Sequence, residues 1–379
     1  MEITVFTNGD SAAISTWSNV PYFFTETLMM KGVKVNRVNI RTSRILKTLY
    51  RISIWQILKR TKNHDGYEYY RTKIHDWHIN FKIKNAVKKY PNSDAFLFLS
   101  FSFSAKKYSA KPTILFGDWT FDHYFNYFKD RAPGSLEKEF IDRENQHIEK
   151  ADLVFVLFPK VAEYMKSRYK NKQIHYIGNV INSKISSNEN EILELKKSSK
   201  KILFIGSNKY KVGADLLLKS FHILQEKNPD LELHFIGLKK SDFTDLPSNV
   251  FCHGYLNKEI ETERKLYYDL LTTAKMYVNT TPKWSAFSAT IEAMYFYNPI
   301  LISPYDEFSQ TFGEQNDFVN YGSSINETDL ANDISALLHH PNYIEICKKT
   351  HNAVSHFTWE SYVNAFLKIT RNYIKNHSI

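Results

Sequence analysis

The residues best suited to bind an anion follow an apolar run at 202–205. Gly206 comes directly after this run, then Lys209 and Lys211, and then a helix-forming segment at 214–225. A glycine lets the backbone approach a phosphate closely, and lysines beside a helix N-terminus neutralise phosphate charge. The order strand, glycine, lysines, helix therefore predicts a phosphate site. A solvated loop of the same composition is the alternative.

A single carboxylate, Glu292, suits the sugar ring of a nucleotide. Its two oxygens can accept the hydroxyl protons of a vicinal diol such as ribose. Glu292 lies in an apolar segment at 288–296 that is typical of a helix, and the preceding loop contains Ser285, Phe287 and Ser288. We expect backbone N–H groups of this loop to face a diphosphate. A carboxylate on an ordinary helix surface is the alternative.

Taken in order, these motifs resemble the family-four retaining glycosyltransferases of the GT-B fold over about 201–357. Glu292 matches the second glutamate of a family motif in which two glutamates stand eight positions apart, and the family uses it to hold the ribose. The segment 249–254 resembles one that wraps the nucleotide base, so the resemblance adds Gly254 to the nucleotide-sugar-binding residues. Trp284 replaces the first glutamate, which contacts the donor sugar in the family.

The first half of the chain contains two candidate catalytic residues, Asp118 and His123. Both follow an apolar run at 113–116. Ligands of α/β proteins bind at the carboxyl ends of strands, so Asp118 is placed to orient a donor sugar or an acceptor hydroxyl. Its alternative role is to cap the helix that follows. The segment 114–121 also resembles one found in some members of the family.

A basic block lies between Arg41 and Tyr90. It contains thirteen Lys or Arg and three Asp or Glu, an excess equal to the formal charge of the whole chain, +10. The segment 44–60 is expected to form one amphipathic helix. Either it binds an anionic membrane or acceptor, or its apolar face packs on the sheet of its own domain. The predicted membrane or acceptor patch consists of Arg44, Lys47, Arg51, Lys59 and Arg60.

Strands and helices must alternate to position these groups. Strands separated by helical segments predict parallel sheets that are covered by helices on both faces. In the first half, strands are predicted at 3–7, 33–40, 95–100, 113–116, 153–157 and 173–177. In the second half, they are predicted at 202–205, 231–236, 276–279 and 300–303.

We therefore predict an α/β fold with two Rossmann-like domains facing a cleft, the GT-B architecture that the resemblance implies. The N-terminal domain, 1–182, is expected to bind the acceptor. A polar stretch at 183–200 is the predicted linker. The C-terminal domain, 201–357, is expected to bind the nucleotide sugar. The last helix, 358–379, is expected to pack back on the N-terminal domain.

Composition and missing motifs exclude several other classes. The two cysteines, Cys252 and Cys347, lie in no metal-type spacing, so no zinc site is expected, and this usage fits a reducing cytosol. No run approaches eighteen apolar residues, and the first residues are typical of a strand rather than a signal peptide. The P-loop and dinucleotide-binding motifs are absent. The basic block carries no RNA-binding or zinc-finger motif, so no nucleic-acid partner is expected.

The sequence thus predicts a cytoplasmic glycosyltransferase, peripheral on the inner face of the membrane. It would move a sugar from a nucleotide diphosphate sugar to a hydroxyl of a glycan or lipid-linked acceptor, in cell-surface polysaccharide or glycoconjugate synthesis. The resemblance implies retention of configuration and no metal or cofactor. The alternative is a non-catalytic GT-B subunit that binds a partner or glycan, because Trp284 replaces the first glutamate and Ser207 replaces an arginine of the family. A nucleotide-sugar epimerase is a third, weaker alternative.

Overall fold

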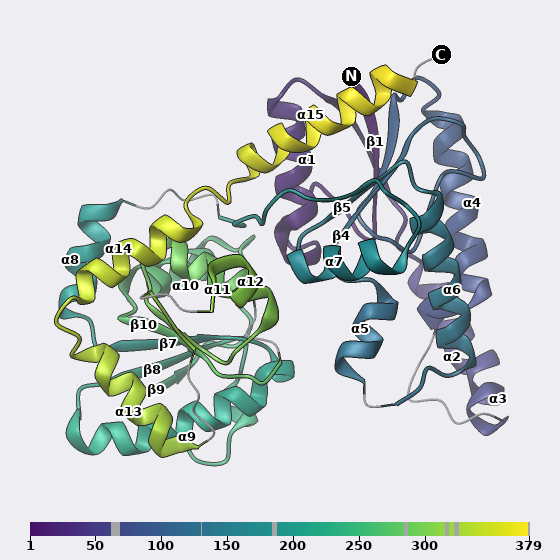
Figure 1. The fold of residues 1–379 in the computed structure, drawn as a ribbon. Coiled ribbons are helices and arrows are strands. Elements are labelled where there is room, and N and C mark those ends of the chain that lie inside the picture. Colours follow the sequence, from purple (N-terminus) through teal and green to yellow (C-terminus); the bar gives the residue numbers. More distant parts are fainter. Residues whose placement is uncertain are drawn as a thin grey trace. The chain divides into compact units, whose positions relative to one another are not determined.

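The chain forms two compact units in the computed structural model (Figure 1). Unit 1 contains Met1–Asn179 and Trp359–Ile379, and unit 2 contains Val180–Thr358. The structure describes residues 1–61, 69–129, 131–183, 188–283, 287–314, 318–321 and 326–377.

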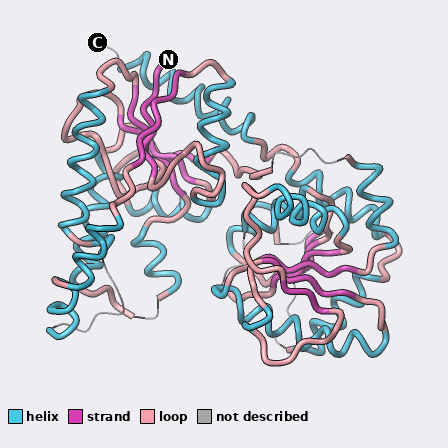
Figure 2. The backbone as a smooth tube through the Cα atoms, turned by 180° about the vertical axis from the view of Figure 1, so that it is seen from behind, coloured by secondary structure: helices cyan, strands magenta, loops and turns pink. Residues whose placement is uncertain are grey.

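Unit 1 is built on a parallel six-stranded sheet in the order β2-β1-β3-β4-β5-β6. Its middle strands are buried on both faces, which explains why they appear in the sequence as continuous apolar runs. In Figure 2 this sheet is a layer between helices. The strands are β1 (Glu2–Thr7), β2 (Lys34–Asn39), β3 (Ala95–Phe98), β4 (Thr113–Gly117), β5 (Leu153–Val156) and β6 (Ile174–Tyr176).

The C-terminal helix of the chain completes unit 1. Helix α15 (Trp359–His377) packs beside α1 (Val20–Met30) (Figure 1). The ring centroid of Phe24 on α1 lies 5.4 Å from that of Trp359 and 5.1 Å from that of Phe366. The other helices of unit 1 are α2 (Arg44–Ile52), α3 (Ile54–Thr61), α4 (Lys73–Lys89), α5 (Phe121–Phe128), α6 (Ser135–Lys150) and α7 (Pro159–Arg168).

The prediction of a single helix over 44–60 is wrong, because the helix is interrupted at Ser53, between α2 and α3. Ser53 has φ −113° and ψ −91°, which is not helical. Its hydroxyl donates to the carbonyl of Leu49 at 2.5 Å, and its N–H donates to the same oxygen at 3.1 Å. A serine hydroxyl that bonds back to the preceding turn competes with helical pairing, which fits the end of α2 at this point.

Unit 2 has a second parallel six-stranded sheet, in the order β12-β11-β10-β7-β8-β9. Helices α9 and α13 pack on one face, where Leu217, Phe221 and Ile334 meet Phe204 and Phe235 of the sheet. The strands are β7 (Lys201–Ile205), β8 (Glu232–Ile236), β9 (Val250–Cys252), β10 (Met276–Asn279), β11 (Ile300–Ile302) and β12 (Val319–Tyr321). The helices are α8 (Glu189–Ser198), α9 (Lys211–Lys227), α10 (Glu261–Thr273), α11 (Phe287–Tyr295), α12 (Asp306–Phe312), α13 (Glu327–Leu338) and α14 (Tyr343–Val354).

Helix α8 falls within the segment 183–200 that was expected to be a linker. Its Lys196 is fully buried, and the Nζ atom donates to the carbonyls of Leu271 and Ala274 and to Oδ1 of Asn298, at 3.2, 2.7 and 2.8 Å. These three acceptors compensate the buried amine. Burial lowers the pKa of Lys196 to about 7. The described residues of α8 are therefore part of unit 2 and not a linker.

Both sheets reverse their strand order once. In unit 1 the chain leaves β1 toward β2 and leaves β3 toward β4, on opposite sides. In unit 2 it leaves β7 toward β8 and β10 toward β11, again on opposite sides. Ligands of parallel α/β sheets bind at the carboxyl ends of such neighbouring strands. Ligand sites are therefore expected at the carboxyl ends of β1 and β3 in unit 1, and of β7 and β10 in unit 2.

Candidate functional site

The backbone is packed closely at the carboxyl ends of β7, β8 and β10. A Cβ atom on Gly237, which has φ +96°, would lie 2.5 Å from the carbonyl oxygen of Gly206. A Cβ on Gly213, in the first turn of α9, would lie 2.5 Å from Oγ1 of Thr281. These glycines bring the N-terminus of α9 against the end of β10. Unit 2 thus presents a helix N-terminus at the switch point of its sheet, as an anion site requires.

The two lysines predicted to hold phosphates lie in the same turn, but they already contact protein groups. Lys211 forms an ion pair with Asp215, one turn further along α9, and its Nζ atom lies 4.4 Å from the ring centroid of Phe243. Lys209 places its Nζ atom 5.6 Å from the ring centroid of Tyr210. A phosphate would therefore compete with Asp215 for Lys211.

Glu292 is buried on α11, with 4% of its surface exposed. Its Oε1 accepts from Nζ of Lys258 at 2.8 Å, and its Oε2 accepts from the same Nζ at 3.1 Å and from the Tyr267 hydroxyl at 2.8 Å. The Lys258 Nζ also lies 4.0 Å from the ring centroid of Tyr267. Burial and the neighbouring carboxylate raise the pKa of Tyr267 far above its ordinary value.

These contacts limit what Glu292 can bind. A carboxylate offers about four acceptor positions, and three are in use. The remaining position lies on Oε1. The expectation that Glu292 accepts both ribose hydroxyls therefore requires Lys258 to move. Without that movement, it can accept one. Sequence reasoning missed Lys258 and Tyr267, whose only signals are a charge in a loop and an aromatic residue on a helix.

The other predicted nucleotide-binding residues differ in how exposed their side chains are. The Phe287 ring is buried and packs on Phe308, with the ring centroids 4.5 Å apart, whereas Ser288 is exposed. Ser285 lies outside the described residues. Gly254 has φ +66°, and its backbone pairs with Leu238 and Gly237 at 2.9 and 2.7 Å, so it joins the ends of β8 and β9.

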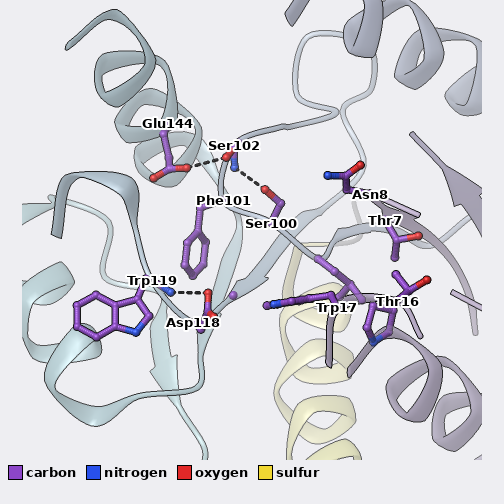
Figure 3. A pocket seen from close by; sticks show the side chains of 13 residues that line it. Thr7, Asn8, Thr16, Trp17, Ser100, Phe101, Ser102, Asp118, Trp119 and Glu144 are labelled. Carbon is purple, nitrogen blue, oxygen red and sulfur yellow. Dashed lines mark hydrogen bonds between the residues drawn. The ribbon is translucent and has the colours of Figure 1, made fainter. Parts of the chain in front are cut away.

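A cavity of about 310 Å³ lies at the switch point of unit 1 (Figure 3). Asp118, at the end of β4, lines it as the sequence predicted for a ligand site. Its Oδ1 accepts from the backbone N–H of Trp119 at 2.8 Å. Other lining residues come from the end of β1 and the loop after it, the end of β3, and α6: Thr7, Asn8, Thr16, Trp17, Ser100, Phe101, Ser102 and Glu144.

Glu144 on α6 is a site residue that sequence reasoning missed. Its Oε2 accepts from the Ser102 hydroxyl at 2.7 Å and its Oε1 accepts from the N–H of Phe121 at 2.5 Å, so it joins two loops. Burial, with the nearby carboxylate charges of two aspartates, raises the pKa of Glu144 to about 7. One signal was available: Glu144 falls between Ile141 and Ile148, at helical spacing on the buried face.

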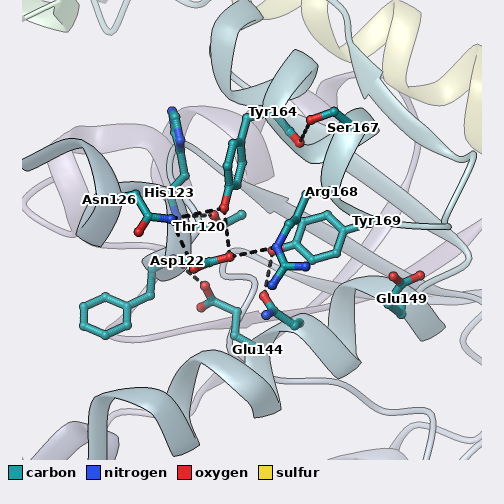
Figure 4. A network of polar contacts seen from close by, with 12 residues as sticks. Thr120, Asp122, His123, Asn126, Glu144, Glu149, Tyr164, Ser167, Arg168 and Tyr169 are labelled. Atoms are coloured by element: carbon teal, nitrogen blue, oxygen red, sulfur yellow. Dashed lines mark hydrogen bonds and ion pairs between the residues drawn. The ribbon is translucent and has the colours of Figure 1, made fainter. Parts of the chain in front are cut away.

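His123, the other predicted catalytic residue, is not among the residues that line this cavity. Its ring stacks between Trp119 and Tyr164, with centroids at 4.8 and 4.2 Å. Burial lowers the pKa of His123, which favours the neutral ring. Beside it, Asp122 accepts from the Tyr164 hydroxyl at 2.8 Å and from Arg168 at 3.2 Å (Figure 4). His123 thus belongs to the contacts that fix α5 against α7.

The structure bears on one of the two alternatives for the basic block, packing on the sheet of its own domain. On α2, Tyr50 is the buried residue, whereas Ile45, Leu49 and Ile52 are 72%, 52% and 60% exposed. The apolar side of α2 therefore does not pack on the sheet of unit 1.

Three of the predicted basic residues, Arg44, Lys47 and Arg51, lie on the same helix as this apolar side. Arg44 and Arg51 are exposed, and Lys47 donates to the Tyr70 hydroxyl at 2.9 Å. Lys59 and Arg60 belong to α3, and their side chains lie outside the described part of the structure.

No three His, Cys, Asp or Glu side chains in the described segments gather as a metal-binding group would. Nor does any helix there combine the length and the apolar character that crossing a bilayer requires.

Comparison with known proteins finds a family match within unit 2. Residues 186–354 match the family described as glycosyl transferases group 1. No curated protein sequence matches the chain. Among solved structures, the sucrose-phosphate synthase of Thermosynechococcus elongatus has a TM-score of 0.69 at 15% identity, over 98% of each chain. A glycosyltransferase from Rickettsia africae has a TM-score of 0.63 at 14% identity, over 99% of each chain.

A third solved structure contains a ligand of the expected class. Alr3699/HepE from Anabaena, in complex with UDP and glucose, has a TM-score of 0.64 at 10% identity, over 97% of this chain and 99% of that one. At these identities the likeness shows the fold. The predicted pair of parallel sheets flanked by helices, in two Rossmann-like domains, is confirmed. The chain is therefore a GT-B-fold protein whose residues 186–354, nearly the whole of unit 2, match the glycosyl transferases group 1 family.

Proposed function

We propose that the chain transfers a sugar from a nucleotide diphosphate sugar to a hydroxyl of a glycan or lipid-linked acceptor, with retention and without a metal or cofactor. The observation that carries this proposal is the close packing in unit 2. There, Gly206, Gly213 and Gly237 bring the N-terminus of α9 to the switch point between β7 and β10. The family match over the same residues supports a nucleotide-sugar ligand.

Each unit would carry one part of the reaction. In unit 2, the first turn of α9 with Lys209 and Lys211 would hold the diphosphate, and Glu292 would accept a hydrogen bond from the ribose. Backbone N–H groups at the start of α11, near Ser288, would add to the diphosphate site. In unit 1, Asp118 would orient the acceptor hydroxyl from the wall of the cavity.

The ribose assignment is tested by calorimetry with UDP and GDP. Glu292→Ala removes one charge-assisted hydrogen bond, so we expect a loss of about 1.5–3 kcal/mol in binding free energy, a Kd weaker by roughly 10- to 150-fold. Glu292→Gln keeps an acceptor oxygen and is expected to lose less. Glu261→Ala, at an exposed position on α10, is the matched control. Equal affinity for wild type and Glu292→Ala would refute the assignment.

One observation favours a non-catalytic GT-B subunit as a second candidate. The carboxylate expected to hold the ribose is already bonded to Lys258 and Tyr267, as in a structural ion pair. A panel of sugar nucleotides, incubated with and without a membrane fraction, separates the two candidates. Release of nucleotide diphosphate that depends on the membrane fraction supports the transferase, and no release with any sugar nucleotide supports the non-catalytic subunit.

We further propose that α2 holds the protein on the inner face of an anionic membrane, where cell-surface glycoconjugates are made. The exposure of Ile45, Leu49 and Ile52 beside Arg44 and Arg51 supports this. Each basic residue near such a surface contributes about 1 kcal/mol. An apolar face beside basic residues is typical of helices that lie in the interface.

Sedimentation with vesicles tests the membrane proposal. Vesicles that contain phosphatidylserine should bind the protein, and vesicles of phosphatidylcholine alone should bind it weakly. Replacing Ile45, Leu49 and Ile52 together by serine should abolish sedimentation. Met30→Ser removes an equally exposed apolar residue from α1, 75% exposed, and should change nothing. If the triple variant sediments like wild type, α2 is not the contact.

A further inference from the structure

The residues that line the cavity of unit 1 indicate which chemical class of acceptor it could bind, and they lie outside the segment that matches the family. We propose that this cavity binds the ring of a neutral sugar, stacked on the indole of Trp17, as the acceptor of the transfer. The proposal rests on the function proposed above and names the class of its second substrate.

The side chains that line the cavity offer no positive charge to attract an anionic ligand. Two carboxyl groups, Asp118 and Glu144, line it, and no Lys, Arg or His is among its lining residues in the described part of the chain. A phosphate next to the Asp118 carboxylate would be repelled by it. Anionic ligands need the opposite charge or the N–H groups of a helix N-terminus. Helix α1 reaches the cavity at its start through Pro21, which has no N–H to donate. The ligand that fits is therefore uncharged.

The polar groups of the cavity suit a polyhydroxy ligand. Carboxylates accept hydroxyl protons, and a side-chain amide both donates and accepts. Asn8 is exposed at the end of β1, and its amide makes no hydrogen bond to any other described residue. It faces the cavity from the strand next to the one that carries Ser100. Hydroxyl groups of one sugar ring can thus meet Asn8 on one side and Asp118 on the other.

The loop that carries Trp17 is held in a strained conformation. Trp17, Ser18 and Asn19 have φ values of +36°, +52° and +71°, in the left-handed region that residues with a side chain rarely adopt. Residues held in this region are strained, and such strain is characteristic of ligand clamps. Hydrogen bonds hold the loop: the Thr16 hydroxyl donates to the carbonyl of Asp10 at 2.6 Å, and the Asn19 amide donates to that of Ile14 at 2.5 Å.

This turn places an aromatic ring on the wall of a polar cavity. In Figure 3 the Trp17 indole lies between Asp118 and the side of the cavity that carries Thr7 and Asn8. Its ring centroid is 6.0 Å from that of Phe116, in an edge contact. A pyranose presents C–H groups on one face and hydroxyl groups at its rim, which matches an aromatic face surrounded by polar side chains. The volume, about 310 Å³, is at the low end of small-molecule sites and suits one ring rather than a long chain.

Saturation-transfer NMR on the full chain, without nucleotide, tests the proposal. The neutral probes are methyl glucoside and methyl N-acetylglucosaminide, and the anionic probes are glucose 1-phosphate and glycerol 3-phosphate. At millimolar concentration we expect a signal from at least one neutral probe and none from the anionic probes. Because no nucleotide is present, failure of the ribose assignment in unit 2 does not affect this result, and the converse also holds.

Variants of two residues make the test specific. Trp17→Ala should weaken the neutral probe by at least about tenfold, and Trp17→Phe, which keeps an aromatic face, should restore most of the affinity. Trp77→Ala, at a position on α4 that is 70% exposed, is the control. If Trp17→Ala disturbs the loop, Asp118→Asn provides an independent test, because Asp118 lies at the end of β4. In this variant the neutral probe should bind more weakly and the anionic probes more strongly. Preferential binding of an anionic probe by wild type, no signal from either glycoside, or unchanged binding by Trp17→Ala would overturn the proposal.

Discussion

Replacing Lys258 by methionine would measure how much of the stability of unit 2 depends on the buried pair with Glu292. The two side chains are 11% and 6% exposed, so solvent screens their interaction little. Methionine keeps the length of the side chain and removes the charge. The Glu292 carboxylate would then keep one of its present donors, the Tyr267 hydroxyl at 2.8 Å. A buried ion that loses its partner costs about 3–5 kcal/mol, and this is the expected loss of unfolding free energy.

A second variant separates the charge effect from the loss of packing. In Lys258→Met combined with Glu292→Gln, the site is uncharged, and the glutamine oxygen can still accept from Tyr267. We expect the double variant to recover at least about 2 kcal/mol of the loss, because neutralising both members of a buried pair is far less harmful than removing one. Urea unfolding measures the free energies. Hydrogen exchange of the α10 and α11 amides shows whether the change lies in unit 2.

Lys265→Met is the matched control, since Lys265 is exposed on α10 and its substitution should change stability by less than about 0.5 kcal/mol. High salt should leave the effect of Lys258→Met largely unchanged. A Lys258→Met protein as stable as the control would show that the pair is not the buried, mutually compensating unit described here. Strict additivity of the two single changes would lead to the same conclusion.

Two further predictions concern Glu144 on α6 and Gly213 on α9, two helix residues near the carboxyl ends of the strands. Burial raises the pKa of Glu144 to about 7 from an ordinary 4.5, so the folded protein retains a proton that the unfolded chain releases. Its unfolding free energy should fall by up to about 3 kcal/mol as the pH rises from about 4.5 to 7, and urea titrations of Glu144→Gln should lack this component. Gly213→Ala places a Cβ 2.5 Å from Oγ1 of Thr281 and should cost about 1–3 kcal/mol, partly offset by the better helix propensity of alanine. Thermal unfolding should then show a lower Tm, whereas Gly134→Ala, with its nearest contact at 3.5 Å, should be tolerated.

The central strands of both sheets were predictable from the sequence because they are buried on both faces. The run at 276–279, for example, has the same bounds as β10. Asp118 was predictable as a cavity residue for a related reason, since the end of a parallel strand marks where ligands bind. The short edge strands β9 and β12 were not predicted.

The partners of the site residues could not be predicted in the same way. Lys258 meets Glu292 across 34 positions of chain, and no periodic pattern connects them. The left-handed turn at Trp17 contains no glycine, the residue from which a positive φ is usually predicted. The polar composition of 183–200 concealed the buried side of α8, because Lys196 is buried through hydrogen bonds rather than through apolar character. Local sequence shows which segments are strands, but not which distant polar groups satisfy one another.

The return of the chain to unit 1 at Trp359 has a consequence for biosynthesis. The aromatic contacts of Phe24 with Trp359 and Phe366 cannot form until the last helix has left the ribosome. At typical elongation rates, translation of the intervening residues 180–358 takes roughly 10–35 s. During that interval the earlier-made part of unit 1 lacks α15, so Phe24 is without its aromatic partners on that helix. A nascent chain stalled before Trp359 should therefore bind a chaperone through its N-terminal segment.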